Sequence, residues 1–285
     1  MAPHDLTIFT GWYCAGNPLA LDYKPDGADE NRGLALRPLW WESVRRFLAP
    51  SQVVVVDSNS PVPPPDGEHF DGRLEHIRLL RNPGHSQTTS YHYCGWTASV
   101  LLGLEYALIN DLDYFLYIEQ DALLFGERFL DRIKDSLRQH RFVFGSGHGT
   151  AWPLQQSVFA IRKDGYRSFL ARMHQIAPTD RELSPELKFG VAAATSPFTR
   201  QALDRLVRLP SAEWRMKAVR KTVKLFPEFG VLPFGYGRIR PIRFDEDCFY
   251  FQQGTTEELA AYARRLGVPA PARQRAPGLK ALSRA

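Results

Sequence analysis

Cysteine is scarce in this chain. Its 285 residues include only three, Cys14, Cys94 and Cys248. They are odd in number, far apart in sequence and without the close spacing of a metal-binding motif. This pattern predicts reduced, buried thiols in a cytoplasmic protein rather than disulfides or a cysteine metal site.

Long apolar runs are also absent. No stretch approaches the ~18 uninterrupted apolar residues that a membrane helix requires. The first residues, MAPHDLTIFTGWY, show no basic leader followed by an apolar segment, so we expect no signal peptide. Hydrophobic residues nevertheless make up 44% of the chain, which is enough for the core of one large domain.

Acidic residues are missing from two basic segments. Residues 215–224 hold five Lys and Arg, and residues 264–285 hold six, within a chain of formal net charge +5. An anionic substrate or a negatively charged membrane face would suit such charge. Because no basic stripe is interleaved with aromatic residues, we do not expect a nucleic-acid partner.

The first 125 residues alternate apolar strand patterns with helical ones. We predict strands at 6–10, 53–56, 75–80 and 114–118, and helices at 38–48 and 95–110. This order predicts an α/β fold with a mostly parallel central sheet flanked by helices. Further elements follow at 127–139 (helix), 142–144 and 157–161 (strands) and 164–173 (helix).

The pattern weakens in the C-terminal part. Residues 176–199 look irregular, apart from a short helix at 185–189. Residues 212–226 predict an amphipathic helix with Met216, Val219, Val223 and Phe226 on one face. Two readings stay open for it: peripheral contact with the inner face of an anionic membrane, or packing of its apolar face on the core.

One motif dominates the first half. The apolar run Tyr114–Ile118 predicts a strand buried on both faces, and Glu119 and Asp121 follow it. Residues two apart in an extended chain point to the same side, and ligands of open α/β sheets bind at this edge. The pair predicts either a divalent metal site or one helix-capping and one solvated acid.

This constellation resembles the GT-A fold glycosyltransferases, whose D-x-D motif follows the fourth strand. Here Glu119-Gln120-Asp121 stands in its place, after strands ending in Asp57 and in Arg81-Asn82. The resemblance implies a single catalytic domain over 1–267. Its nucleotide-sugar-binding half would be 1–125 and its acceptor-side half 126–267. The Pro, Ala and basic residues of 268–285 predict a disordered tail.

The resemblance further implies a nucleotide-diphosphate sugar donor and bound Mn²⁺ or Mg²⁺, with Asp121 as ligand. Glu119 would ligate the metal, hold a metal-bound water or contact the ribose. The donor-binding residues would be Thr10, Trp12, Tyr13, Asp57, Arg81, Glu119, Gln120, His148 and Arg240. For Asp57 a turn-forming role stays open, and for Trp12 core packing. No His follows His174, so either Gln252 or Gln253 would replace the C-terminal His ligand of many relatives, or that ligand is absent.

An inverting transferase also needs a general base for the acceptor, a saccharide or a lipid-linked sugar. Glu186, at a predicted helix start, is our candidate, with Asp180, Glu182, Asp245 and Asp247 as rivals. A surface acid in a helical first turn is the alternative for Glu186. Two other functions stay open: a sugar nucleotidyltransferase and a non-catalytic nucleotide- or sugar-binding module.

Overall fold

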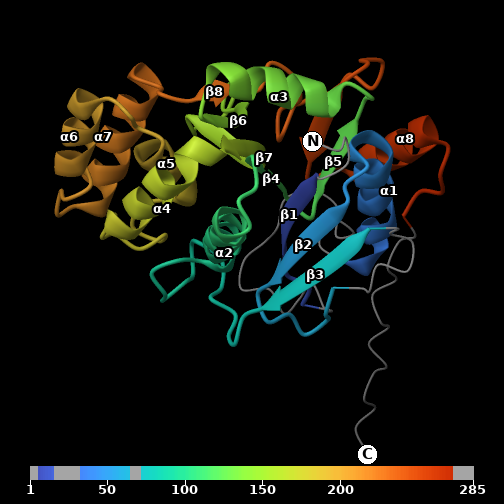
Figure 1. Cartoon of the computed structure of the whole chain (residues 1–285), viewed down its shortest axis with the longest axis horizontal. Helices are drawn as coiled ribbons and strands as arrows, with labels where there is room; N and C mark the ends of the chain where they lie inside the picture. Colours follow the sequence, from blue (N-terminus) through green and yellow to red (C-terminus); the bar gives the residue numbers. More distant parts are fainter. Residues whose placement is uncertain (1–5, 16–32, 65–71, 272–285) are drawn as a thin grey trace, which may run out of the picture.

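A seven-stranded sheet forms the centre of the computed structural model, which describes residues 6–15, 33–64 and 72–271 (Figure 1). The strand order is β3-β2-β1-β4-β7-β6-β8. β1 pairs in parallel with β2 and β4, and β2 with β3, whereas β7 runs antiparallel to both of its neighbours. The predicted mostly parallel α/β fold is therefore confirmed. The bounds are β1 Thr7–Trp12, β2 Gln52–Asp57, β3 Arg73–Arg78, β4 Tyr114–Ile118, β6 Phe142–Ser146, β7 Leu154–Arg162 and β8 Gly230–Val231.

Helices cover both faces of this sheet, which explains the unbroken apolar strands. In β2, for example, Val53 and Val55 face one core while Val54 faces the other. One core is closed by α1, α3 and α8, and the other by α2 and α4 to α7. The bounds are α1 Arg37–Leu48, α2 Gly95–Ile109, α3 Phe129–Gln139, α4 Tyr166–Gln175, α5 Pro185–Ala192, α6 Pro197–Leu206, α7 Ala212–Leu225 and α8 Thr256–Leu266.

A second, two-stranded sheet brings the end of the chain back to the acidic motif. β5, Ala122–Phe125, begins directly after Asp121 and pairs antiparallel with β9, Phe249–Gln252. In this register Ala122 lies opposite Gln252. The C-terminal part therefore contributes side chains to the edge at which β4 ends.

Helix α6 is the main departure from the sequence prediction. Its start lies within the stretch 176–199, where we expected only one short helix, although Ser196 caps it and Pro197 occupies its first turn. These are ordinary helix-start signals. The predicted tail, 268–285, lies outside the described residues from position 272 onward.

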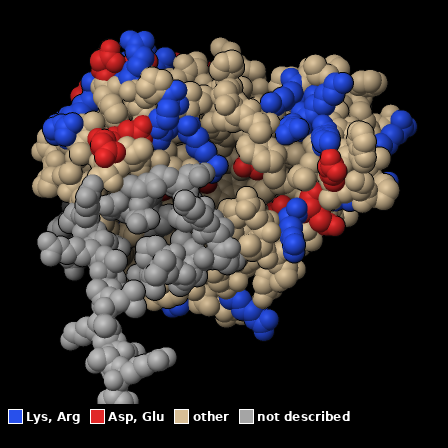
Figure 2. Space-filling model, turned by 180° about the vertical axis from the view of Figure 1, so that it is seen from behind, with Lys and Arg blue, Asp and Glu red and all other residues tan. Residues whose placement is uncertain are grey.

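The apolar face of α7 packs on the core. Val219 and Val223 are buried, and Val223 lies so close to α5 that a Cβ added at Gly190 would come within 2.6 Å of it. Phe226, expected on the same face, is exposed. Lys and Arg side chains gather at the edge of the molecule where α6 and α7 lie (Figure 2).

The three cysteines are buried, as predicted. Burial raises the pKa of the Cys94 thiol to about 12, so this thiol stays protonated and unreactive near neutral pH. Among the described helices, none is long and apolar enough to cross a bilayer.

Candidate active site

A cavity of about 390 Å³ opens where the four parallel strands end. The end of β1, the loops after β2 and β3, and the acidic motif after β4 all contribute to its wall. The starts of α2 and α5, Gln156 of β7 and Arg238 complete it. The lining residues are Gly11, Trp12, Tyr13, Ser58, Asn82, Gly84, His85, Ser86, Cys94, Gly95, Trp96, Ser99, Tyr117, Glu119, Gln120, Asp121, Gln156, Pro185, Glu186 and Arg238.

The two acids of the motif both reach this cavity. Asp121 is buried, with 4% of its surface exposed, and Glu119 is half-buried. The backbone of Glu119 is held from two sides, because its N–H donates to the Ser157 carbonyl and its carbonyl accepts from Trp40 Nε1. The pair therefore sits on a rigid strand end.

Gln252 joins these acids from β9. Its Nε2 donates to Glu119 Oε2 at 2.7 Å, and the neighbouring Gln253 N–H reaches the Asp121 carbonyl at 3.4 Å. The Gln252 side chain is buried. A contact across 133 residues thus orients one carboxylate of the motif.

These groups fit a divalent cation of the Mg²⁺ or Mn²⁺ type. Within the described residues there is no cluster of three or more His, Cys, Asp and Glu that would enclose a metal completely. Mg²⁺ in nucleotide enzymes is typically held by one or two carboxylates, with water and phosphate oxygens completing its octahedron. Glu119 and Asp121 supply that number of carboxylates, in a cavity with room for a phosphate ligand.

Gln120, between the two acids, has a structural task. Tyr13 N–H donates to Gln120 Oε1 at 2.8 Å, and Gln120 Nε2 donates to the Tyr13 carbonyl at 3.0 Å. The side-chain amide thus forms the pair of hydrogen bonds that a neighbouring strand would form, and it fixes Tyr13 just after the end of β1. Trp12 is buried beside it, with its indole N–H on the Val62 carbonyl, so it combines core packing with one edge of the cavity wall.

Two of the residues that line the cavity are the aromatic pair Trp96 and Tyr117. Trp96 and Tyr117 meet edge to face, with ring centroids 5.7 Å apart. The Tyr117 hydroxyl accepts from the Gly11 N–H and lies 3.0 Å from Ser99 Oγ. A Cβ on Gly11 would stand 2.7 Å from both oxygens, so this approach requires glycine.

Glu186, the predicted general base, lies in the same wall as the acidic motif. It occupies the first turn of α5, where Ser184 is the N-cap residue and Pro185 begins the helix. Burial raises the pKa of Glu186 above its ordinary value, and the positive charge of Arg238 opposes that rise. Of the five acids considered from sequence, Glu186 is the one that lines the cavity.

The rival acids are engaged elsewhere. Asp180 is buried in an ion pair with Lys188, and Glu182 accepts from Thr179. Asp245 is exposed and pairs with Arg243. Asp247 is exposed and outside the cavity lining.

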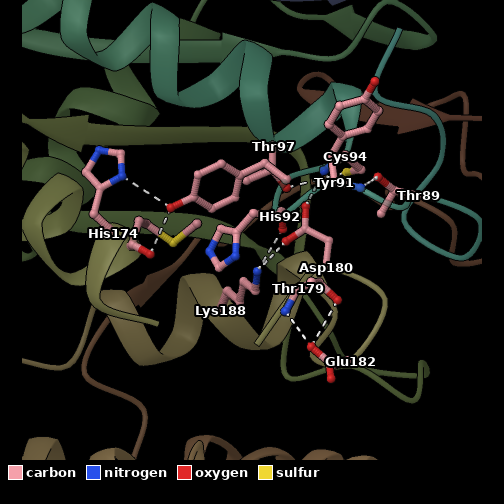
Figure 3. A network of polar contacts seen from close by, with 12 residues as sticks. Thr89, Tyr91, His92, Cys94, Thr97, His174, Thr179, Asp180, Glu182 and Lys188 are labelled. Carbon is pink, nitrogen blue, oxygen red and sulfur yellow. Dashed lines mark hydrogen bonds and ion pairs between the residues drawn. The ribbon is translucent and has the colours of Figure 1, made fainter. Parts of the chain in front are cut away.

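The Asp180–Lys188 pair connects two parts of the cavity wall (Figure 3). Lys188 belongs to α5, and its Nζ lies 2.7 Å from Asp180 Oδ1. The other oxygen, Oδ2, accepts from the Cys94 N–H at the start of α2. Lys188 also reaches the His92 carbonyl at 3.4 Å. One buried network therefore fixes the helix of Glu186 relative to the start of α2.

Five residues predicted to bind the donor lie outside the cavity lining: Thr10, Asp57, Arg81, His148 and Arg240. Thr10 is completely buried inside β1. Asp57 has the turn-forming role, because its Oδ1 accepts from the Ser60 N–H at 2.9 Å. Arg81 and His148 are exposed.

Arg240 is occupied by structural contacts. Its guanidinium donates to the carbonyls of Gly237, Ile239, Gln252 and Gln253, and its Nε pairs with Glu258 at 2.6 Å. It therefore fixes the segment that carries Gln252. The nearby Arg238 reaches the cavity instead.

Several cavity residues were not singled out from sequence. Asn82, Gly84, His85 and Ser86 follow β3, and the turn signal Asn-Pro-Gly at 82–84 was the available clue to that loop. Trp96, Ser99, Tyr117 and Gln156 belong to helices and strands. Their side chains carried no pattern distinguishable from core residues.

Comparison with known proteins gives a limited result. No family model matches the chain, and no curated protein matches its sequence. Among solved structures, the chain is similar to 4-diphosphocytidyl-2C-methyl-D-erythritol synthase from Anaerococcus prevotii. The identity is 14%, the match covers 59% of this chain and 76% of that chain, and the TM-score is 0.35.

Proposed function

We propose that the protein is a metal-dependent glycosyltransferase that moves a sugar from a nucleotide-diphosphate sugar to a saccharide or lipid-linked acceptor. The observation that carries this proposal is the convergence of Glu119, Asp121, Glu186 and Arg238 on one cavity. The carboxylates of Glu119 and Asp121 suit a metal ion bound to a diphosphate. Glu186, whose pKa is raised, suits a general base, and the guanidinium of Arg238 suits the departing phosphate.

The donor would lie across the ends of the parallel strands. Glu119 and Asp121 would hold Mn²⁺ or Mg²⁺, while Gln252 orients the Glu119 carboxylate through its 2.7 Å hydrogen bond. A bound divalent cation supplies electrostatic stabilisation for charge that grows on the diphosphate during bond breaking. Tyr13, Trp96 and Tyr117 offer aromatic surface in the same cavity for the base or the sugar.

Glu186 would act on the acceptor. Its carboxylate takes the proton from the acceptor hydroxyl as that oxygen bonds to the anomeric carbon. The bond between this carbon and the diphosphate oxygen breaks, and the nucleoside diphosphate leaves with the electron pair. Arg238 would offset part of the resulting charge. A base acting in a single displacement makes the transfer an inverting one, so the anomeric configuration of the product tests this role.

The proposal is tested first by thermal-shift measurements with a panel of nucleotide sugars, each with Mn²⁺, with Mg²⁺ and with EDTA. A ligand at about 100 times its Kd should add about 2.7 kcal/mol to the free energy of unfolding. We expect one donor class to stabilise the protein only when the metal is present. Absence of any nucleoside diphosphate or nucleotide sugar binding, with or without metal, would refute the proposal.

The same donor then separates the competing functions. A transferase releases nucleoside diphosphate from the nucleotide sugar and passes the sugar to water or to an acceptor. A sugar nucleotidyltransferase would instead release pyrophosphate from a nucleoside triphosphate and a sugar phosphate. A binding module would show metal-linked stabilisation with neither release.

A further inference from the structure

The outer side of α6 and α7 carries an unusual share of the exposed apolar side chains. Within the described residues ten large hydrophobic side chains are exposed, and four of them lie here: Phe198, Trp214, Leu225 and Phe226, at 74%, 67%, 61% and 54%. Thr195 and Ser196, just before α6, donate to Glu228 after α7. The start of α6, which carries Phe198, therefore lies beside the end of α7, which carries Leu225 and Phe226.

This surface is also basic. Residues 196–228 contain eight Lys and Arg and three Asp and Glu, a net charge of +5 that equals that of the whole chain. The three acids are engaged: Asp204 with Arg172, Glu213 with Lys217, and Glu228 with backbone N–H groups. Lys221 and Lys224, in the last turns of α7, form no ion pair with any acid in the described part of the chain. Figure 2 shows basic side chains along this edge.

We propose that this surface, formed by Phe198, Trp214, Leu225, Phe226, Lys221 and Lys224, docks the protein on an anionic lipid bilayer. Trp and Phe favour the headgroup region, Leu gains from burial among acyl chains, and lysines are attracted by anionic lipids. Of the helix face predicted from the sequence, only Phe226 belongs to this surface, since Val219 and Val223 are buried in the protein.

Two other occupants fit less well. A second copy of the chain, related by a twofold axis, would place this basic surface against itself, and like charges would repel. A single-stranded nucleic acid gains from aromatic stacking but gains nothing from an exposed leucine. Charge and apolar character together therefore favour a lipid surface over both.

Co-sedimentation of the full chain with vesicles tests the proposal. Vesicles of phosphatidylcholine with phosphatidylglycerol should bind the protein, and vesicles of phosphatidylcholine alone should bind it poorly. Each lysine replaced by a neutral residue should lower partitioning about fivefold, so Lys221→Gln/Lys224→Gln should lose about 25-fold. Phe198→Ser/Phe226→Ser should lose about tenfold or more.

Matched controls lie elsewhere on the surface. Ile109→Ser removes an apolar side chain that is 79% exposed at the end of α2, and Arg128→Gln removes an exposed charge beside α3; neither should change partitioning. All substituted side chains are exposed or lie at a helix end, so circular dichroism and the thermal midpoint should match wild type. Binding of either double variant at the wild-type level, or no binding by wild type, would overturn the proposal.

The outcome is independent of the proposed catalysis, because these residues lie outside the cavity lining. The variants should keep any metal-linked stabilisation by a nucleotide sugar. Binding of wild type to single-stranded RNA, with none to anionic vesicles, would assign the surface to nucleic acid and refute a membrane role.

Discussion

Lys188 Nζ lies 2.7 Å from Asp180 Oδ1, and both side chains are completely excluded from solvent. Burial lowers the pKa of Lys188, while the Asp180 charge acts in the opposite direction. The aromatic ring of Tyr93 lies 5.3 Å from the same ammonium group. Because Asp180 also accepts from the Cys94 N–H, the pair connects the helix of Glu186 to the start of α2.

Removing one member of this pair should destabilise the protein strongly. Lys188→Met leaves a buried carboxylate without its cation, which costs about 3–5 kcal/mol. Lys188→Met/Asp180→Asn removes both charges and retains an oxygen for the Cys94 N–H, so it should be more stable than the single variant. Urea unfolding monitored by circular dichroism measures both. A double variant no more stable than Lys188→Met would contradict this account.

Asp121→Asn should abolish metal-linked donor binding. The substitution keeps the size of a 4%-exposed side chain but removes the charge that a divalent cation needs. Titration of Mn²⁺ in the presence of the donor, followed by thermal shift, measures the effect. Asp113→Asn is the matched control, since Asp113 is exposed just before the opposite end of β4. Retained metal-dependent binding in Asp121→Asn would remove Asp121 from the ligand set.

Glu186→Gln should lower kcat about 100-fold or more, within the range for loss of a general base. The raised pKa of Glu186 keeps its carboxyl protonated to higher pH than an ordinary Glu. Since the base form is present only above that pKa, kcat/KM of wild type should fall as pH decreases through a midpoint above 4.5. This decrease of kcat/KM at low pH should be absent in Glu186→Gln and should persist in Glu182→Gln, whose carboxylate is exposed.

Gln252→Ala should weaken metal binding without removing a ligand carboxylate. Its amide donates to Glu119 Oε2 at 2.7 Å, and loss of such an orienting partner typically reduces metal affinity about 10–100-fold. The apparent Kd for Mn²⁺ with saturating donor is the quantity to compare. Gln201→Ala, at an exposed position of α6, should leave it unchanged. An unaltered Kd in Gln252→Ala would mean that Glu119 needs no such support.

Gly11→Ala should destabilise the protein by about 1–3 kcal/mol through overpacking. The new methyl group would stand 2.7 Å from Ser99 Oγ and Tyr117 OH. Ser99→Ala/Tyr117→Phe removes both oxygens. In that background Gly11→Ala should therefore lower the free energy of unfolding by less than it does in wild type. Thermal unfolding provides the comparison. Destabilisation that persists undiminished in the triple background would place its cause elsewhere.

The fold class and one half of the candidate site could be predicted from local patterns. Uninterrupted apolar runs such as Tyr114–Ile118 predict buried parallel strands because both faces must be covered. Parallel strands also end at one edge, so Tyr13, Glu119 and Asp121 were expected to share a site, and they line one cavity. The same reasoning places Arg81 at this edge. However, β3 ends at Arg78, and Arg81 is exposed and lies outside the cavity lining.

The sequence by itself determined the buried strands, most of the helices and the position of the acidic motif, because hydrophobic periodicity and capping act within a few residues. Only the tertiary structure decided which distant groups meet that motif. Gln252 reaches Glu119 through the β5–β9 pairing, and Arg238, not Arg240, reaches the cavity. These contacts join segments that are far apart in the sequence. They depend on how helices and strands pack against one another, which local sequence patterns do not determine.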